Sequence, residues 1–133
     1  MIIVRNSQLN QDTVEALNLL LDLNLPTKTA FKLVRMIKEI SSLIDDKIKL
    51  ERKIFDRYVE KDSAGNPIMA IDQNGSPIPN AYKLSDSEAF HSEIAELNSI
   101  ESELPFEKLN SDEFQLDSIK VRDLMKLEFI FEI

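Results

Sequence analysis

The chain has 133 residues, of which 43% are hydrophobic and 30% charged, and its formal net charge is −8. A chain of this length can bury about two thirds of its unfolded surface, so we expect a single domain over residues 1–133. The absence of cysteine excludes disulfides and thiolate metal sites, and the acidic balance argues against nucleic acid as a partner.

The first segment, residues 1–26, is expected to hold a strand and a short helix. Met1 to Val4 is a β-branched run typical of a strand, and it is too short to span a bilayer, so no membrane partner is expected. From Gln11 onward apolar residues recur at helical spacing, with Asn10 or Asp12 available as the N-cap. Pro26 ends this helix.

A long basic helix is predicted over residues 27–63. No glycine or proline occurs between Ala30 and Val59, and apolar residues recur every three, four or seven positions: Leu33, Ile37, Ile40, Ile44, Ile48, Phe55 and Val59. We expect Gly65 to supply the left-handed residue after the helix, with Pro67 preventing its continuation.

Residues 64–83 predict a β-hairpin arm. Asn74-Gly75 between two apolar stretches is a strong hairpin signal. With these two residues as the loop, Ile71 pairs with Ile78, and the two prolines of the second strand lie at positions without ladder hydrogen bonds.

An acidic helix is predicted over residues 84–104, beginning at a capping box formed by Ser85 and Glu88. We expect it to run antiparallel to the long basic helix. Because it is much shorter, it leaves half of the basic helix uncovered. The helix near residues 11–24 and the C-terminal segment, or a second copy of the chain in a homo-oligomer, would then cover the rest.

The last segment, residues 105–133, is expected to mix strand and helix. Strict alternation of apolar residues predicts a strand at the end of the chain (Met125, Leu127, Phe129, Phe131, Ile133), while residues 121–127 also fit a helical turn. The fold class is therefore α+β, mainly α. It comprises a long antiparallel helical hairpin, a β-hairpin arm, and short N- and C-terminal strands.

Charge is distributed unevenly along the chain. Residues 28–61 carry ten basic and six acidic side chains, whereas residues 62–133 carry five and fifteen. One interpretation is that the acidic helix lies beside the basic helix and neutralises it. A second interpretation is that the basic helix and the hairpin bind a protein partner through Lys47, Lys49, Arg52, Lys53, Arg57, Ile68, Met69, Ile71 and Ile78.

A third interpretation is that acidic residues imitate nucleic acid and occupy a basic groove on another protein. The carboxylates that would do so are Glu101, Glu103, Glu107, Asp112, Glu113 and Asp117.

No motif for catalysis stands out. His91 is the only histidine, whereas a general base needs a positioned partner and a metal site needs several ligands. Two isolated glycines cannot form a phosphate-binding loop. We therefore expect no catalytic, metal-binding or cofactor-binding residues, and no enzymatic activity.

Several segments resemble a group of small proteins of unknown function that tailed bacteriophages and prophages encode. The resemblance lies in residues 3–7 (IVRNS), 29–35 (TAFKLVR), 58–62 (YVEKD), Phe90 with 93–97 (EIAEL), and 123–130 (DLMKLEFI). It implies a phage origin and a helical α+β fold, and it carries no catalytic residues.

The expected function is thus that of a non-enzymatic, phage-encoded protein that binds another protein. It would inhibit or redirect a host factor, as anti-defence proteins do, in the cytoplasm of the host bacterium. One alternative is a structural or assembly component of the virion. Another is an oligomer that sequesters a nucleotide signal.

Overall fold

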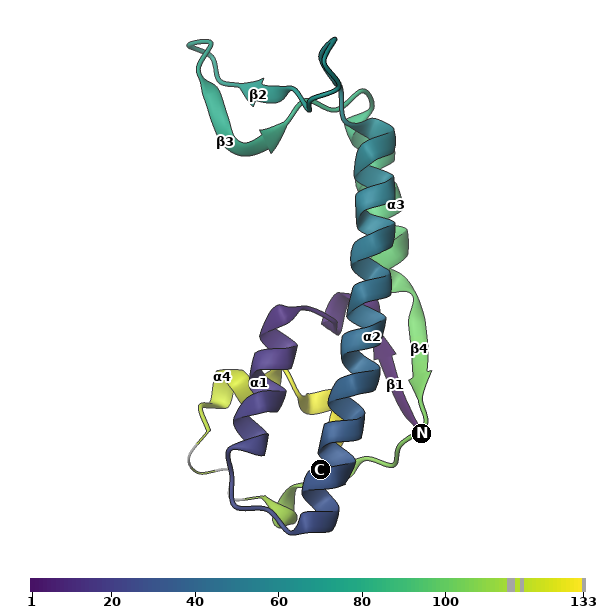
Figure 1. Ribbon diagram of the computed structural model, residues 1–133, viewed down its shortest axis with the longest axis vertical. Helices are drawn as coiled ribbons and strands as arrows, with labels where there is room; N and C mark the ends of the chain where they lie inside the picture. Colours follow the sequence, from purple (N-terminus) through teal and green to yellow (C-terminus); the bar gives the residue numbers. More distant parts are fainter. Residues whose placement is uncertain (115–116, 118, 133) are drawn as a thin grey trace. The chain divides into compact units, whose positions relative to one another are not determined.

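The computed structural model describes residues 1–114, 117 and 119–132 (Figure 1). The expected α+β, mainly α fold is confirmed, with one long helix, three shorter ones and small strand pairs in these ranges. Contacts divide the chain into two compact units where we expected a single domain. Unit 1 comprises Met1–Lys47 and Asn98–Ile133, and unit 2 comprises Ile48–Leu97. The division arises because α2 (Thr27–Tyr58) continues beyond the buried core that surrounds its first half.

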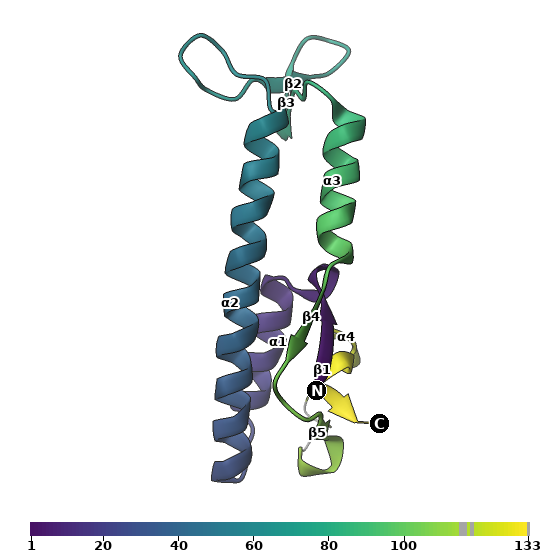
Figure 2. The same cartoon turned by 90° about the vertical axis from the view of Figure 1, so that its right-hand side faces the viewer.

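Unit 1 brings the two ends of the chain together. Strand β1 (Ile2–Arg5) pairs antiparallel with β4 (Glu101–Leu104), so that Ile2 lies opposite Leu104 (Figure 2). Strand β5 (Leu109–Asn110) pairs in parallel with β6 (Phe131–Glu132). Helices α1 (Gln11–Leu21) and α4 (Val121–Met125) complete the unit with the first part of α2. Segments a hundred residues apart in sequence thus share one core.

The hydrophobic core belongs to unit 1. Alternate residues of β1 and the i, i+3, i+4 positions of α1 and α2 point into it, as their periodicities predict. Its buried side chains are Ile2, Val4, Leu9, Ala16, Leu17, Leu20, Leu33, Met36, Ile40, Ile44, Leu104, Phe106, Leu109, Phe114, Leu127, Phe129, Ile130 and Phe131.

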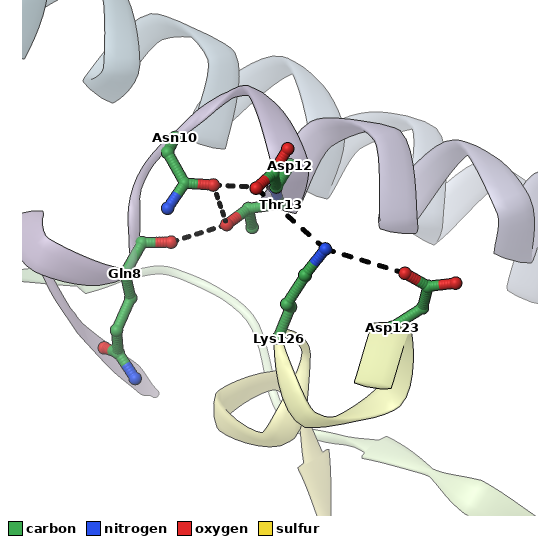
Figure 3. Close-up of polar contacts among 6 residues, drawn as sticks. All are labelled: Gln8, Asn10, Asp12, Thr13, Asp123 and Lys126. Carbon is green, nitrogen blue, oxygen red and sulfur yellow. Dashed lines mark hydrogen bonds and ion pairs between the residues drawn. The ribbon is translucent and has the colours of Figure 1, made fainter. Parts of the chain in front are cut away.

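Polar contacts fix the start of α1 (Figure 3). Asn10 is the N-cap, and its Oδ1 accepts a hydrogen bond from the Thr13 backbone N–H at 3.0 Å. The Thr13 hydroxyl donates to the Gln8 carbonyl at 2.6 Å. Lys126 Nζ lies 4.0 Å from Asp12 Oδ2 and 3.6 Å from Asp123 Oδ1, which links α1 to the residues just after α4. Of the two expected caps, Asn10 therefore acts as one.

Helix α2 ends at Tyr58, five residues before the predicted end at residue 63. The cause is strand-like pairing of the next residues: Val59 bridges Leu84 and Lys61 bridges Pro67. We expected Gly65 to follow the helix directly. It lies instead in a turn farther along the chain. Its φ of +84° is in the left-handed region.

Helix α3 (Ser87–Ser99) is shorter than the predicted acidic helix of residues 84–104. Its N-cap is Asp86, whose Oδ1 accepts a hydrogen bond from the Ala89 N–H at 3.0 Å, so the predicted Ser85–Glu88 capping box is wrong. At the other end, residues 101–104 leave the helix to pair with β1. Pairing that satisfies the backbone of both strands outweighs the weak helical preference of this segment.

The arm, which we define as residues 59–84, contains two turns built on one pattern. Asp62-Ser-Ala-Gly-Asn-Pro-Ile68 and Asp72-Gln-Asn-Gly-Ser-Pro-Ile78 share Asp, Gly, Pro and Ile at equal spacing, ten residues apart. Asp62 Oδ1 accepts from Ala64 N and Asn66 N at 2.9 and 3.0 Å. Asp72 Oδ1 accepts from Asn74 N and Ser76 N at 2.8 and 2.9 Å. The sequence pattern is therefore a structural repeat.

The second turn changes the predicted hairpin register. The Gly75 N–H donates to the Asp72 carbonyl at 3.1 Å, so the central residues are Gln73 and Asn74, not Asn74 and Gly75. As a result Ile71 of β2 (Met69–Ile71) pairs with Pro77 of β3 (Pro77–Tyr82), one residue away from the expected Ile78. The hairpin itself is confirmed.

A ring of three backbone hydrogen bonds closes the base of the arm. The Glu60 N–H donates to the Lys83 carbonyl at 2.9 Å, the Lys83 N–H to Ile68 at 2.8 Å, and the Ile68 N–H to Glu60 at 2.8 Å. Each residue is donor and acceptor once, so three chain segments are held together without a large hydrophobic core. The two turns extend from this ring.

The C-terminal segment is only partly as predicted. The helical turn near residues 121–127 is confirmed as α4, but the alternating strand is wrong, because Glu128–Ile130 forms a 3₁₀ turn and only Phe131–Glu132 is extended. The turn lets the consecutive residues Phe129, Ile130 and Phe131 all be buried, whereas Met125 is exposed. Ile133, which was included in the prediction, lies outside the described residues.

Candidate functional site

Lys47 is a structural residue of unit 1. Its Nζ donates hydrogen bonds to the carbonyl oxygens of Asn6 at 2.8 Å and Leu9 at 3.0 Å. Asn6 begins a 3₁₀ turn, Asn6–Gln8, that follows β1, and Leu9 comes directly after this turn. The ammonium group is thus directed toward the protein's own backbone, which gives Lys47 a structural contact apart from the partner-binding role that the sequence predicts for it.

Arg57 is also engaged within the chain. Its Nη1 lies 2.7 Å from Glu93 Oε1, so it forms an ion pair between α2 and α3 in unit 2. The Tyr58 and Phe90 rings meet edge to face beside it, with centroids 6.2 Å apart. Desolvation of the phenol raises the pKa of Tyr58, the Glu93 carboxylate raises it further, and Arg57 acts in the opposite direction. This contact agrees with the expectation that the acidic helix lies beside the basic one.

Lys49, Arg52 and Lys53 are the exposed remainder of the predicted basic patch. None of the three forms an ion pair within the described ranges. Arg52 also lines a groove of about 460 Å³ together with Ile48, Glu51, Phe55, Phe90 and Ile94. The basic patch is therefore smaller than predicted, and it borders an apolar surface.

The four apolar residues that the sequence predicts for partner binding all lie exposed in the arm. The exposed fractions are 36% for Ile68, 40% for Met69, 65% for Ile71 and 39% for Ile78. Ile68 and Ile78 occupy the same place in the two repeated turns, directly after the proline. The structure thus presents a set of apolar side chains on an arm whose backbone is well hydrogen-bonded.

Tyr82 belongs to this apolar set but was missed by the sequence reasoning. It is 41% exposed and lies opposite Met69 in the β2–β3 pair. Directly opposed residues in an antiparallel pair project from the same face, so Met69 and Tyr82 lie together. Edge-to-face packing on Phe55, with centroids 5.3 Å apart, holds the Tyr82 ring in place. The predicted hairpin register named the Ile71–Ile78 pair and gave no signal for Tyr82.

A second groove, of about 550 Å³, lies in unit 1 and was also missed. Lys28, Lys32 and Arg35 of α2 line it together with Glu107 and Glu113. The Arg35 guanidinium lies 5.7 Å from the centroid of Phe106, and the Thr29 hydroxyl donates to Glu113 at 3.3 Å. The lining thus mixes three basic groups with two acidic groups, and this mixture does not identify a class of ligand.

Several carboxylates of the proposed nucleic-acid mimic make contacts inside unit 1. Glu101 pairs with Arg5 at 3.2 Å, and Glu107 lies 3.8 Å from the N-terminal ammonium group. Glu113 accepts the hydrogen bond from Thr29. These contacts reduce the acidic surface that could imitate a phosphate backbone.

The chemistry-bearing side chains are dispersed. His91 is exposed on α3 and contacts the adjacent Phe90 ring, with centroids 5.4 Å apart. Among the residues that the structure describes, no three His, Cys, Asp or Glu side chains gather in a way that could hold a metal ion. Within the same ranges, none of the helices combines the length and apolar character needed to cross a bilayer. Comparisons with protein-family models, curated proteins and solved structures gave no match.

Proposed function

We propose that this chain is a non-enzymatic protein-binding protein and that the arm is its binding surface. The observation that carries the proposal is the exposure of Ile68, Met69, Ile71, Ile78 and Tyr82 on a single small element. Exposed apolar residues are common singly, but a group of them on one element is typical of a surface that another protein covers. Burying such side chains on binding would yield roughly 25 cal/mol for each Å² of apolar area.

The arm's backbone suits this role because it is organised before any partner arrives. The two Asp side chains and the ring of hydrogen bonds at residues 60, 68 and 83 fix the loops that present the apolar residues. A preorganised surface loses less conformational entropy on binding than a mobile one. Pro77 and Pro79 also lack an N–H group, which limits non-specific pairing of β3 with other strands.

The partner we propose is a protein of the host bacterium, which the chain inhibits or redirects as an anti-defence protein of a phage would. This reading takes the phage origin from the resemblance and the apolar arm from the structure. The nucleotide-sequestering alternative has less support, since Lys47 and Arg57 of the predicted basic patch contact groups within the chain. In the virion alternative, the same arm would bind a neighbouring virion protein.

Capture from a bacterial lysate tests the proposal with two matched variants. Ile71→Asp alters the most exposed of the arm's apolar residues, at 65%, while Met125→Asp alters a residue in unit 1 that is 69% exposed. We expect one stoichiometric partner to bind the wild type and the Met125 variant but not the Ile71 variant. Equal capture by both variants, or no specific partner at all, would contradict the proposal.

Mass spectrometry of purified phage particles separates the host-factor and virion roles. If the chain acts on a host protein, it should be absent from the particles while present in infected cells. Stoichiometric presence in the particles would instead favour the virion role, and the arm's partner should then be sought among virion proteins.

A further inference from the structure

The groove between α2 and α3 in unit 2 is lined mainly by apolar side chains. Ile48 and Phe55 of α2 and Phe90 and Ile94 of α3 form its apolar part, and Glu51 and Arg52 complete it. Ile48 is 38% exposed. All these residues belong to unit 2 and lie on the two facing helices.

Unit 2 has almost no hydrophobic core of its own. Every residue between Ile48 and Leu97 is described, and Val59 and Leu97 are the only buried hydrophobic side chains among them. Two antiparallel helices have too few faces to enclose their apolar residues, which is why such hairpins commonly pair into four-helix bundles. The helices that would cover the apolar residues of this hairpin would therefore have to come from outside unit 2.

Helix α3 has a charged side and an uncharged side next to the groove. Since residues three and four apart share a helix face, Glu93 and Leu97 lie on one side of Phe90 and Ile94, and Ser87, His91 and Asn98 lie on the other. The Glu93 side is held to α2 of the same chain by the ion pair with Arg57, whereas the other side has no carboxylate, lysine or arginine next to the groove. Depletion of charge beside an apolar surface is typical of the centre of a protein interface.

The charges of the two helices identify the occupant as a second copy of the same hairpin. Residues 48–58 of α2 carry four basic and two acidic side chains, whereas α3 carries three glutamates and no lysine or arginine. An unrelated helix would need a matching pattern of its own, but a second copy already has one. Arg57 and Glu93 pair within each chain, but Arg52 of one copy can face Glu88 at the edge of the other copy's α3, and the reverse holds across a two-fold axis.

We propose that two copies of this chain pair through the groove to form a four-helix bundle, with α2 of each copy beside α3 of the other. The apolar side chains of Ile48, Phe55, Phe90 and Ile94 from both copies form its centre. Arg52 of one copy lies near the α3 row of the other that holds His91, with Glu88 at its edge. The pairing uses unit 2's helices and does not depend on a partner for the arm.

The mass of the protein in solution, by light scattering at micromolar concentration, tests this pairing. We expect twice the chain mass of 15.3 kDa for the wild type. Ile48→Glu should give a monomer, whereas Leu50→Glu should remain a dimer. The two residues have similar exposure, 38% and 45%, but lie about 200° apart around α2, so only Ile48 faces the groove.

Arg52→Glu distinguishes the arrangement of the helices without altering an apolar residue. If α2 lies beside the other copy's α3, the added negative charge faces Glu88 where Arg52 had complemented it, and the dimer dissociation constant should rise at least about tenfold. If α2 lay beside its own symmetry mate, the same change would relieve repulsion and tighten the dimer, which would overturn the arrangement. Circular dichroism of each variant confirms that the helices remain folded.

The absence of cysteine allows a direct check of proximity. When Arg52→Cys and His91→Cys proteins are mixed in equal amounts and oxidised, cross-linked heterodimers should exceed the two homodimers taken together, which is the share that random pairing gives. A monomeric wild type overturns the proposal, and so does an Ile48→Glu protein that dimerises as well as Leu50→Glu. A monomer whose lysate partner is lost only with Ile48→Glu would show that a different protein occupies the groove.

Discussion

Lys47 shows that the position of a basic residue on a helix does not decide whether it is available to a partner. It lies in the row of cations that the sequence predicts as a patch, yet its ammonium group bonds to two backbone carbonyls at 2.8 and 3.0 Å. A charged donor that satisfies two carbonyls is worth more to stability than an exposed charge. Its neighbour Lys49 is exposed and provides the natural comparison.

Lys47→Met should therefore destabilise the protein, by about 1–3 kcal/mol, because the Asn6 and Leu9 carbonyls lose their donor while the apolar stem is kept. Lys49→Met, two residues away, should change the free energy of unfolding by less than about 0.5 kcal/mol. Urea unfolding followed by circular dichroism measures both values. Equal values for the two variants would show that Lys47 has no structural role.

Ionisation of the Tyr58 phenol should lower the stability of the folded protein at alkaline pH. Folding raises its pKa above the ordinary value of 10.0, through desolvation and the Glu93 carboxylate, so the folded state binds the phenol proton more tightly than the unfolded state does. The stability that this provides is complete below pH 10.0 and is lost as the pH rises through the folded-state pKa. Tyr58→Phe should therefore lose less stability than the wild type above pH 10.0.

The chain's two tyrosines allow this titration to be isolated. In the Tyr82→Phe variant, tyrosinate absorbance reports Tyr58 alone, and its midpoint should lie above 10.0 in the folded protein. A midpoint at or below that value would contradict the assigned cause, and so would identical alkaline losses in the wild type and Tyr58→Phe.

Among the elements, the start of α3 offers a direct comparison between a predicted cap and an observed one. Asp86→Ala removes the hydrogen bond from the Ala89 N–H to Oδ1 and should destabilise unit 2 by about 1 kcal/mol. Ser85→Ala removes the predicted cap and should be nearly neutral, because the described contact of Ser85 is through its backbone N–H to Tyr58. Amide exchange in residues 87–92 measures both effects. A larger effect for Ser85→Ala would show that the capping box does form.

Elements whose local pattern agrees with their environment could be predicted from the sequence. The helical period from Leu33 to Ile44 matches the buried face of α2, and the β-branched residues of β1 alternate into the core as expected. Residues 101–104 could not be predicted, since Glu-Ser-Glu-Leu continues a helical pattern and becomes a strand only by pairing with β1, a hundred residues away. Tertiary pairing outweighs weak local preference there.

The candidate site also has parts that local sequence could predict and parts that it could not. The apolar arm was predictable because a short hairpin cannot bury Ile68, Met69, Ile71 and Ile78, whichever register it adopts. The register itself depends on Asp72, whose side chain draws Asn74 and Ser76 into a longer turn than Asn-Gly alone suggests. The acceptors of Lys47 are main-chain carbonyls, which leave no signature in the sequence.

At the scale of the whole molecule, buried apolar surface is concentrated in one of the two units. The large hydrophobic core lies in unit 1, while unit 2 holds the groove and the exposed apolar residues of the arm. Helix α2 belongs to both units, since Lys47 and Ile48 lie on either side of their boundary. One continuous helix therefore has two parts with very different amounts of buried apolar surface. This difference should be measurable as local stability.

Hydrogen exchange along α2 tests this division. Leu33, Met36 and Ile40 are fully buried, whereas none of residues 48–58 of α2 has a buried side chain. Burial of each such side chain contributes about 1.5–3 kcal/mol, and about 1.4 kcal/mol corresponds to a tenfold change in an equilibrium constant. In dilute solution, amides in residues 33–44 should therefore exchange at least about tenfold more slowly than those in 48–58.

Protein concentration then separates intrinsic protection from protection by a second copy. If unit 2 pairs through its groove, exchange in residues 48–58 should slow as the concentration rises, while exchange in 33–44 stays constant. Ile48→Glu should abolish this concentration dependence and Leu50→Glu should preserve it, because only Ile48 lines the groove. Uniform exchange along α2 would show that the helix unfolds as one unit, so that the uneven burial does not divide the molecule's stability.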